Sequence, residues 1–370
     1  MAKERVLILS NNSFGFYRFR KELLEALVKR YEVYVSTPDD GYIDEMKAIG
    51  IKFVDTPINR RGVNPFKDLA LLRRYRFMMR EIKPDVVLAH TAKPNIYGNL
   101  AARRLKIPVI SAITGLGDGF HNKNIVGSIV KFLYRVSLRK TVCITFPNRD
   151  DEGIMRRAGI IRDHHRVLFV SGSGVNLQDY QVLEYPESDE VSFLYMGRIK
   201  ASKGVGELIE ASRKLKLESK SGFNVTLMGM DEEEVSMDEA IKEGVIRYIG
   251  LQKDIVPHVR AAHCIVLPSY TEGMSNSLLE GAASGRPLIT TTAPGCKEAV
   301  DEGVNGFLCQ PADAHGLYEC MKRFTLLSND ERLKMGLASR RKVENEFDRN
   351  LVVDIMLKEI AMILEKRSKE

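Results

Sequence analysis

The chain has 370 residues, of which 44% are hydrophobic and 28% are charged. This composition excludes a disordered or fibrous protein, and the length exceeds what one hydrophobic core usually supports, so we expect two globular domains. The formal net charge is +7, but residues 1–170 carry 31 Lys and Arg against 17 Asp and Glu, whereas the remainder carries 25 against 32. The basic half predicts an anionic partner: nucleic acid, an anionic membrane surface or a diphosphate-linked substrate.

The sequence lacks the usual signals of export, membrane insertion and metal binding. The first apolar run, at residues 6–9, is too short for a signal peptide, and no run of about 18 apolar residues exists, so a cytoplasmic protein without a membrane span is expected. The five cysteines show no paired metal spacing, which favours buried thiols in a reducing compartment. No Asp-rich stretch follows a strand in a metal-binding setting, and we expect no metal or other cofactor.

Strands and helices are predicted to alternate along residues 1–172. Short apolar runs predict strands at residues 6–9, 31–35, 52–54, 85–89, 108–111, 143–146 and 167–170. Helices are predicted between them at residues 16–29, 42–49, 66–82, 96–105 and 150–158. This alternation is typical of an α/β domain on a doubly wound parallel sheet, in which ligands bind at the carboxyl ends of the strands.

Two residues that follow these strands are candidates for substrate contact. Gly15 comes after the first strand and could let a phosphate approach the backbone at a helix N-terminus, although a plain turn glycine fits equally well. No G-x-G-x-x-G accompanies it, which argues against a nicotinamide dehydrogenase. His90 follows the fourth strand and could bind substrate or simply satisfy backbone groups.

Two basic amphipathic segments, residues 60–80 and 124–140, mix Leu, Phe, Tyr and Met with Lys and Arg. They fit ordinary helices packed on the sheet. The excess of positive charge in this half supports the alternative that one of them lies on an anionic membrane surface.

A second α/β series is predicted at residues 191–348, after a turn-rich and polar hinge at 173–190. Its strands are predicted at residues 191–196, 223–228, 246–249, 264–267, 287–291 and 305–308. Its main helices are predicted at residues 205–217, 254–262, 313–326 and 329–346, with another after residue 276. A final helix within residues 349–370 has one apolar face, and we expect it to pack back on the first domain.

The segment Gly197-Arg-Ile-Lys-Ala-Ser-Lys-Gly204 joins the first strand of this series to a helix. Arg198, Lys203 and the helix N-terminus could converge on a diphosphate. The alternative is a pair of surface cations, which the helix dipole mildly disfavours at a helix start.

Two carboxylates, Glu272 and Glu280, follow the strand at 264–267, one in a loop and one in the next helix. A loop carboxylate there could accept hydrogen bonds from sugar hydroxyls, and one in the helix could reach a ribose. Taken alone, both residues fit solvated surface positions.

Together, Gly-Arg-x4-Lys-Gly and Glu-x7-Glu resemble the retaining glycosyltransferase family 4. Further matching pieces are His90-Thr-x-Lys-Pro-Asn, Thr114-Gly-Leu-Gly, Ser173-Gly-Val-Asn, Pro294-Gly-Cys-Lys-Glu and Gly303-Val-Asn-Gly. The resemblance covers nearly the whole chain and implies a GT-B fold, with two Rossmann-like doubly wound domains facing a central cleft. It is strongest to the bacterial undecaprenyl-diphosphate-glycan transferases of capsule, O-antigen and N-glycan assembly, which include N-acetylgalactosaminyltransferases.

The resemblance also implies a donor site. Arg198 and Lys203 would hold the donor diphosphate and neutralise charge on the leaving UDP, and Glu272 would hold the donor sugar. Glu280 would accept from the ribose hydroxyls. The complete implied donor set is Gly15, Gly197, Arg198, Lys203, Gly229, Gly250, Leu251, Glu272, Gly273, Met274, Ser275, Asn276 and Glu280. Ser275 stands where the family usually has Pro, which leaves the choice of hexose open.

The resemblance further implies an acceptor site in the first domain. Its residues would be His90, Lys93, Thr114, Gly115, Asp118 and His121. For His121, an ordinary loop histidine is the alternative.

The resulting prediction is a metal-independent retaining glycosyltransferase, peripheral on the inner face of the cytoplasmic membrane. It would move a hexose, expected to be an N-acetylhexosamine or a uronic acid, from a UDP-sugar to a polyprenyl-diphosphate-linked saccharide, with no nucleic-acid partner. Two alternatives remain: a UDP-sugar isomerase or epimerase of similar shape, and a non-catalytic nucleotide-sugar-binding or nucleic-acid-binding protein. The non-catalytic protein could keep Arg198 and Lys203 without needing Glu272.

Overall fold

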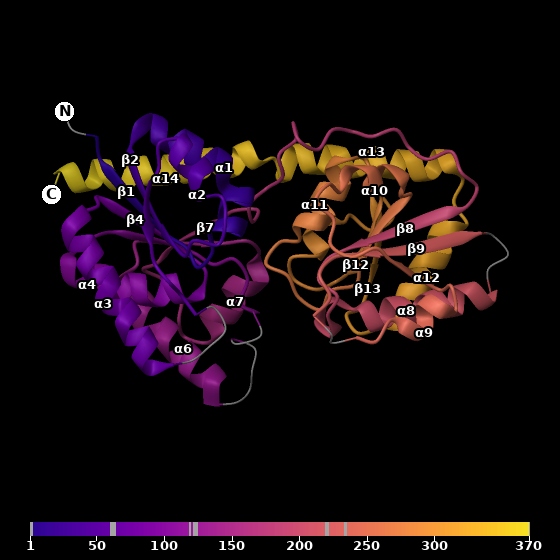
Figure 1. Cartoon of the computed structure of the whole chain (residues 1–370), viewed down its shortest axis with the longest axis horizontal. Coiled ribbons are helices and arrows are strands. Elements are labelled where there is room, and N and C mark those ends of the chain that lie inside the picture. Colours follow the sequence, from indigo (N-terminus) through magenta and orange to yellow (C-terminus); the bar gives the residue numbers. More distant parts are fainter. Residues whose placement is uncertain are drawn as a thin grey trace. The chain divides into compact units, whose positions relative to one another are not determined.

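The chain forms two compact units in the computed structural model, which describes residues 3–59, 64–117, 120, 125–218, 222–232 and 235–369 (Figure 1). Unit 1 consists of residues 1–173 together with 349–370. Unit 2 consists of residues 174–348. The chain therefore returns to the first unit at its C-terminal end.

Unit 1 is built on a parallel sheet, which has seven strands in the described part of the chain, in the order β3-β2-β1-β4-β5-β6-β7. The strands are β1 (Arg5–Leu9), β2 (Glu32–Thr37), β3 (Lys52–Asp55), β4 (Val86–His90), β5 (Val109–Ala112), β6 (Cys143–Phe146) and β7 (Arg166–Phe169). The helices are α1 (Ser13–Arg30), α2 (Ile43–Ala48), α3 (Pro65–Ile82), α4 (Asn99–Leu105), α6 (Ile125–Ser137), α7 (Arg149–Arg157) and α14 (Arg349–Lys369). The short π-helical turn η1 (Pro94–Gly98) precedes α4, and the 3-10 turn η2 (Leu138–Lys140) follows α6.

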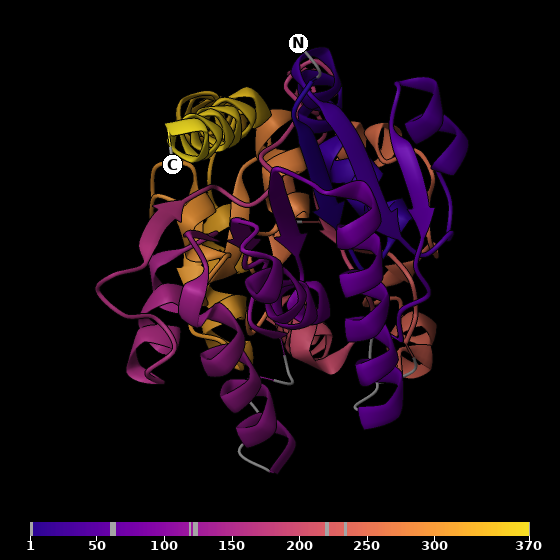
Figure 2. The same ribbon diagram turned by 90° about the vertical axis from the view of Figure 1, so that its left-hand side faces the viewer.

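Both faces of this sheet are covered, which explains why its strands read as continuous apolar runs. Val6 and Ile8 of β1 pack with α1, α2 and α14, whereas Leu7 and Leu9 pack with α3, α4, α6 and α7. Successive side chains of a strand point to opposite faces, so one strand serves both cores. Figure 2 shows α14, in yellow, on the other side of the sheet from α3 and α6.

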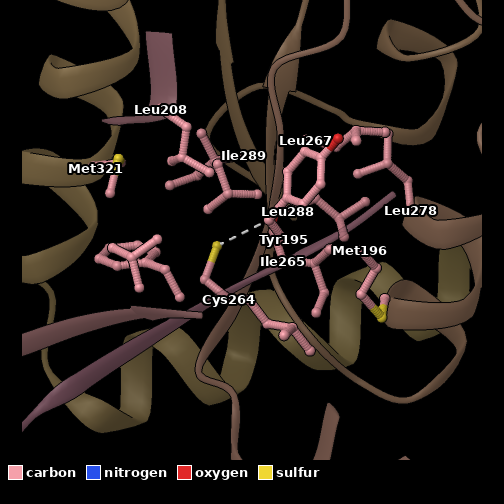
Figure 3. Close-up of a cluster of buried hydrophobic side chains, with 14 of the residues drawn as sticks. Tyr195, Met196, Leu208, Cys264, Ile265, Leu267, Leu278, Leu288, Ile289 and Met321 are labelled. Atoms are coloured by element: carbon pink, nitrogen blue, oxygen red, sulfur yellow. Dashed lines mark hydrogen bonds between the residues drawn. The ribbon is translucent and has the colours of Figure 1, made fainter. Parts of the chain in front are cut away.

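Unit 2 has a second parallel sheet, with six strands in the described residues, in the order β10-β9-β8-β11-β12-β13. The strands are β8 (Val191–Met196), β9 (Phe223–Met228), β10 (Arg247–Tyr248), β11 (Cys264–Leu267), β12 (Leu288–Thr291) and β13 (Gly306–Cys309). The helices are α8 (Val205–Glu218), α9 (Asp238–Lys242), α10 (Val256–Ala261), α11 (Asn276–Ala283), α12 (Ala314–Thr325) and α13 (Asn329–Glu346), with 3-10 turns η3 (Ala201–Lys203) and η4 (Lys297–Ala299). Its core joins Ile265 and Ile289 of the sheet to Leu208, Leu278 and Met321 of the helices (Figure 3).

Residues 183–185, within the predicted hinge at 173–190, contact the rest of unit 2. Tyr185 donates a hydrogen bond from its hydroxyl to the carbonyl of His263 at 2.8 Å. Arg286, which is completely buried, donates to the carbonyls of Leu183 and Glu184. A buried guanidinium needs several acceptors, and the backbone of this stretch supplies them.

The described residues contain no helix that is both long and apolar enough to cross a bilayer. All five cysteines are free and buried, and burial raises the pKa of Cys296 to about 12.

Candidate active site

The strand order of unit 2 reverses between β8 and β11, which are neighbours in the sheet. Beyond β8 the order runs to β9, and beyond β11 it runs to β12. Loops that leave the carboxyl ends of two such strands diverge, and the space between them is where open α/β sheets bind ligands. The loops here are residues 197–204 and 268–275, the two stretches that the sequence singled out.

Glycines let these loops approach one another closely. Gly204 has a φ of +71°, and a Cβ there would overlap the carbonyl of Pro268. Gly229 has a φ of +152°, and a Cβ there would overlap the carbonyl of Gly197. The contact between Gly204 and Pro268 is reinforced by the Tyr270 amide, which donates to the carbonyl of Ser202 at 3.0 Å. Only glycine combines this backbone conformation with this proximity.

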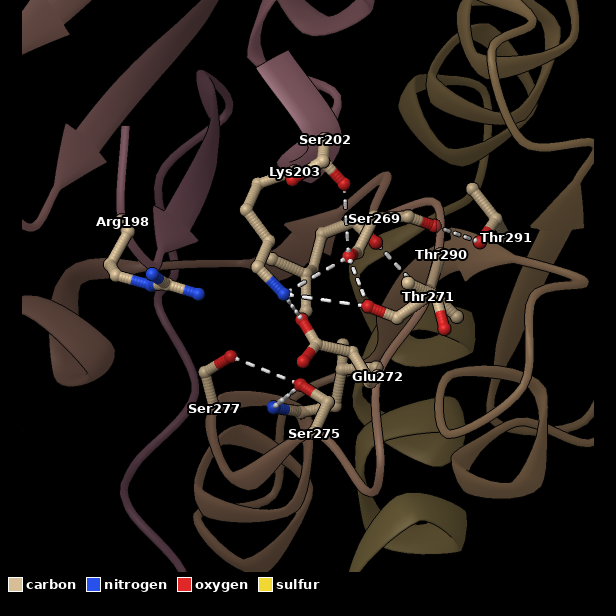
Figure 4. Close-up of polar contacts among 12 residues, drawn as sticks. Arg198, Ser202, Lys203, Ser269, Thr271, Glu272, Ser275, Ser277, Thr290 and Thr291 are labelled. Atoms are coloured by element: carbon tan, nitrogen blue, oxygen red, sulfur yellow. Dashed lines mark hydrogen bonds and ion pairs between the residues drawn. The ribbon is translucent and has the colours of Figure 1, made fainter. Parts of the chain in front are cut away.

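Lys203 and Glu272 form an ion pair between the two loops (Figure 4). The Lys203 ammonium lies 2.6 Å from Glu272 Oε1, and the two side chains are 13% and 20% exposed. The same ammonium donates to the carbonyl of Thr271 at 3.4 Å and to Ser269 Oγ at 3.5 Å. Three acceptors match the three ammonium protons, so Lys203 is held in one orientation.

Arg198 is more exposed, at 47% of its side chain, and pairs with Glu232 at 3.2 Å. Its carbonyl accepts a hydrogen bond from the Tyr195 hydroxyl at 2.7 Å. Burial, with a smaller contribution from Glu272, raises the pKa of Tyr195, so its hydroxyl remains a donor. The backbone of Arg198 is thereby anchored, while an exposed ion pair leaves its guanidinium able to exchange partners.

Hydroxyl side chains that the sequence interpretation overlooked hold the loop after β11. Thr291 Oγ1 donates to the carbonyl of Ser269 at 2.6 Å, and Thr290 Oγ1 donates to the carbonyl of Leu267 at 2.6 Å. Ser269 is itself completely buried. The sequence signal for this role was the run of hydroxyl residues at the ends of β11 and β12. There the backbone hydrogen bonds between strands stop, and side chains can bond to the free carbonyls instead.

Ser275 caps α11 rather than presenting its side chain to solvent. It is 3% exposed, and its hydroxyl accepts from the Leu278 amide at 3.4 Å. Its own amide donates to the carbonyl of Gly295 at 2.9 Å. That bond ties the start of α11 to the loop after β12. Glu280 is the fifth residue of α11, one turn from its start.

Other residues of the predicted donor set that belong to unit 2 lie in the loops after β9 and β10 and before α11. Gly229 donates its amide to the carbonyl of Gly250 at 3.0 Å, which joins the loops after β9 and β10. Leu251, beside Gly250, is 69% exposed. Met274 packs against the core of unit 2 between Glu272 and the start of α11.

In unit 1, the structure corrects the prediction that Gly15 lies in a turn. The helix begins at Ser13, and Gly15 belongs to its first turn. Its amide donates to Asn12 Oδ1 at 2.6 Å, and Asp40 Oδ1 accepts from the amides of Ser13 and Phe14. These two side chains already satisfy the donors at this helix start, because Asn and Asp are strong helix caps.

His90 is buried, and its Nε2 has no hydrogen-bond partner in the described residues. Its ring packs edge-on against Phe16 with centroids 5.0 Å apart. Burial, helped by the charge of Arg20, lowers the pKa of His90 to about 3, so the ring is neutral.

The other acceptor candidates are spread over unit 1. Lys93 pairs with Asp68 at 2.6 Å, and the loop after β5 carries an exposed Thr114 and a half-buried Gly115. Asp118 and His121 lie outside the described residues. Within the described part of the chain, no group of three or more His, Cys, Asp or Glu side chains could hold a metal ion.

Two parallel-sheet units, each with loops gathered at a reversal of strand order, define a GT-B architecture. A family model described as "Glycosyl transferases group 1" matches residues 190–326, and one described as "Glycosyl transferase 4-like" matches residues 5–148. The chain belongs to these family 4-like glycosyltransferases of GT-B fold.

Comparison with known proteins agrees with this assignment. The chain is 28% identical to the N,N'-diacetylbacillosaminyl-diphospho-undecaprenol alpha-1,3-N-acetylgalactosaminyltransferase of Campylobacter jejuni, over 96% of this chain and 97% of that protein. A glycosyltransferase from Rickettsia africae superposes with a TM-score of 0.80 at 20% identity, covering 98% of this chain and 99% of that one. Anabaena HepE in complex with UDP-glucose superposes with a TM-score of 0.77 at 17% identity, covering 97% and 99%.

Proposed function

We propose that this glycosyltransferase transfers a hexose from a UDP-sugar to a polyprenyl-diphosphate-linked saccharide, with retention of anomeric configuration and without a metal ion. The observation that carries the proposal is the Lys203–Glu272 pair at the strand-order reversal of unit 2, with Arg198 on the adjoining loop. The acceptor class is supported by the name of the Campylobacter relative, whose alignment spans nearly the whole of both chains.

The transfer step breaks the bond between the anomeric carbon and the donor's phosphate oxygen, and the electron pair leaves with UDP. A hydroxyl oxygen of the acceptor forms the new bond to the anomeric carbon on the same face. The hydroxyl proton passes to an oxygen of the departing phosphate. Negative charge therefore grows on UDP in the transition state, and positive groups positioned beforehand lower the barrier.

Lys203 and Arg198 would supply that positive charge in different ways. Glu272, at 2.6 Å, would keep Lys203 in place, while its longer contacts to Thr271 and Ser269, at 3.4 and 3.5 Å, would give way to phosphate oxygens. Arg198, whose side chain is 47% exposed, would exchange its partner Glu232 for phosphate oxygens. Glu272 would hold Lys203 with one oxygen and accept a hydroxyl of the donor sugar with the other. These two cations would take the part that a divalent metal plays in other sugar-nucleotide enzymes.

We also infer that the protein works peripherally at the inner face of the cytoplasmic membrane, where lipid-linked saccharides of this kind would be presented. The excess of basic residues over acidic ones in residues 1–170 supports attraction to an anionic leaflet. The proposed sugar is an N-acetylhexosamine or a uronic acid.

A panel of UDP-sugars tests the proposal, each with and without a short polyprenyl-diphosphate saccharide and with added EDTA. UDP release that requires the acceptor and persists in EDTA would support the transferase and identify the donor. The anomeric coupling constant of the product, measured by NMR, would report retention.

Other outcomes would exclude the proposal in distinct ways. A new free UDP-sugar without UDP release would indicate an isomerase. Loss of activity in EDTA, restored by a divalent cation, would contradict metal independence. Absence of turnover and of UDP binding would remove the diphosphate role from Arg198 and Lys203.

A further inference from the structure

Unit 1 contains a pocket of about 590 Å³. Among its lining residues, Lys93 alone belongs to the site predicted from the sequence. It lies where the chain leaves β3, beside residues 67–74 of α3 and close to Lys93, which follows β4 by three positions. Pro57, Ile58 and Leu71 form its apolar part. The pocket borders the segments that follow β3 and β4. It therefore lies near the carboxyl ends of these strands, where α/β folds bind ligands.

The charged lining of the pocket is unbalanced. Lys93 is paired with Asp68 at 2.6 Å, and both side chains are largely buried. Burial, together with the charge of Asp68, raises the pKa of Tyr97. The Asp68 charge is therefore already compensated inside the protein.

Lys67 and Arg74 are the other two cations of the lining. Within the described residues neither is paired with a carboxylate, and Arg74 donates to the backbone carbonyl of Asp55. The pocket thus offers a net positive rim over an apolar interior. That combination suits a phosphate-bearing ligand with an apolar body.

An exposed stripe on the same helix indicates which phosphate-bearing ligand fits. Phe66, Leu69 and Phe77 are exposed, Phe66 to 84% and Phe77 to 67%. Arg73, between Leu69 and Phe77, and Arg80, after Phe77, are exposed too. These residues recur at helical spacing, next to the face that lines the pocket. Aromatic and Arg side chains in alternation are typical of a surface that meets lipid at a membrane interface. A soluble nucleotide would make no use of this stripe.

We propose that the pocket beside α3 binds the diphosphate of a polyprenyl-diphosphate ligand, with Lys67 and Arg74 on the phosphates. This inference rests on the proposed function, since it gives the lipid-linked acceptor its place in unit 1. Lys93 then has a positioning role, because its pair with Asp68 holds the segment after β4 against α3.

The test is equilibrium binding of farnesyl diphosphate, inorganic pyrophosphate and UDP to the full chain. The variant is Lys67→Gln with Arg74→Gln. The control is Lys29→Gln with Arg30→Gln, which removes the same charge from exposed positions at the end of α1. Arg74→Lys tests whether charge alone suffices, and a thermal melt verifies that each variant folds.

Farnesyl diphosphate is expected to bind at least about tenfold more weakly to the Lys67/Arg74 variant, which corresponds to about 1.4 kcal/mol. The Lys29/Arg30 control should bind it within twofold of the original chain, and UDP should bind all chains alike. Inorganic pyrophosphate should bind more weakly than farnesyl diphosphate.

Three results would overturn the inference: no binding of farnesyl diphosphate, no loss in the variant, or a loss of UDP affinity instead. Equal affinity for pyrophosphate and farnesyl diphosphate would remove the lipid from the assignment. If farnesyl diphosphate binding depends on Lys67 and Arg74 but no lipid-linked saccharide is ever glycosylated, the proposed function fails and the pocket assignment stands.

Discussion

Lys203 donates to Glu272 across 69 positions of sequence, and this pair joins the loops that leave the two central strands of unit 2. The motif resemblance assigns the two residues separate tasks, one on the diphosphate and one on the sugar. Their contact means that each sets the orientation of the other, so their contributions to catalysis should not be additive.

Lys203→Gln and Glu272→Gln, singly and together, test this coupling. Each single substitution should lower kcat about 100-fold or more, because a positioned charge that stabilises the leaving group is lost or misplaced. The double variant should be little worse than the weaker single variant. Measuring UDP release at saturating donor gives the three values. If the two single effects on kcat multiply in the double variant, Lys203 and Glu272 act independently of each other.

Gly204→Ala should destabilise unit 2 by about 2 kcal/mol or more, because the residue has a φ of +71° and its Cβ would meet the Pro268 carbonyl. Gly206→Ala is the matched control, since a Cβ at Gly206 meets nothing within 4 Å. That change should be neutral or stabilise α8 by up to about 1 kcal/mol. Urea denaturation of both variants measures the difference, and equal stabilities would contradict the close loop contact.

Arg286→Met should destabilise unit 2 by about 3 kcal/mol or more. The guanidinium donates to six backbone carbonyls, and these would remain buried without donors: Leu183, Glu184, Val259, Arg260, Ser284 and Gly285. Residues 183–184 should also become susceptible to limited proteolysis. Arg341→Met, an exposed position on α13, is the control and should change stability by less than about 0.5 kcal/mol.

His90 should make stability depend on pH. Its pKa is lowered to about 3 in the folded chain, whereas an unfolded histidine titrates near about 6.5. Between these values the unfolded state binds the extra proton, so stability contributed by neutral His90 is complete above about pH 6.5 and is lost as pH falls toward 3. The slope from this group should approach about 1.4 kcal/mol per pH unit at most.

His90→Gln should remove that part of the slope, and His315→Gln, at an exposed position on α12, should leave it in place. Denaturant midpoints at half-unit steps from pH 4 to 7.5 measure both. An unchanged slope in His90→Gln would show that the ring is not held neutral.

The alternation of elements was predictable from the sequence because the central strands of each sheet are buried on both faces and the long helices bury one face. Apolar runs such as that of β11 and helical spacing such as that of α14 follow directly from this burial. The two loops of the unit 2 site were also singled out from the sequence, because Arg198 and Lys203 follow one predicted strand and Glu272 follows another.

Contacts between distant segments were decided only by the tertiary structure. The pairing of Lys203 with Glu272, the burial of Arg286 under residues 183–184 and the pocket beside α3 each join parts of the chain that no local pattern relates. The start of α1 at Ser13 likewise depended on Asp40, 27 residues away. Local periodicity records which face of an element is buried. The partner that covers this face, and the partner of each charged group, is selected by packing over the whole unit.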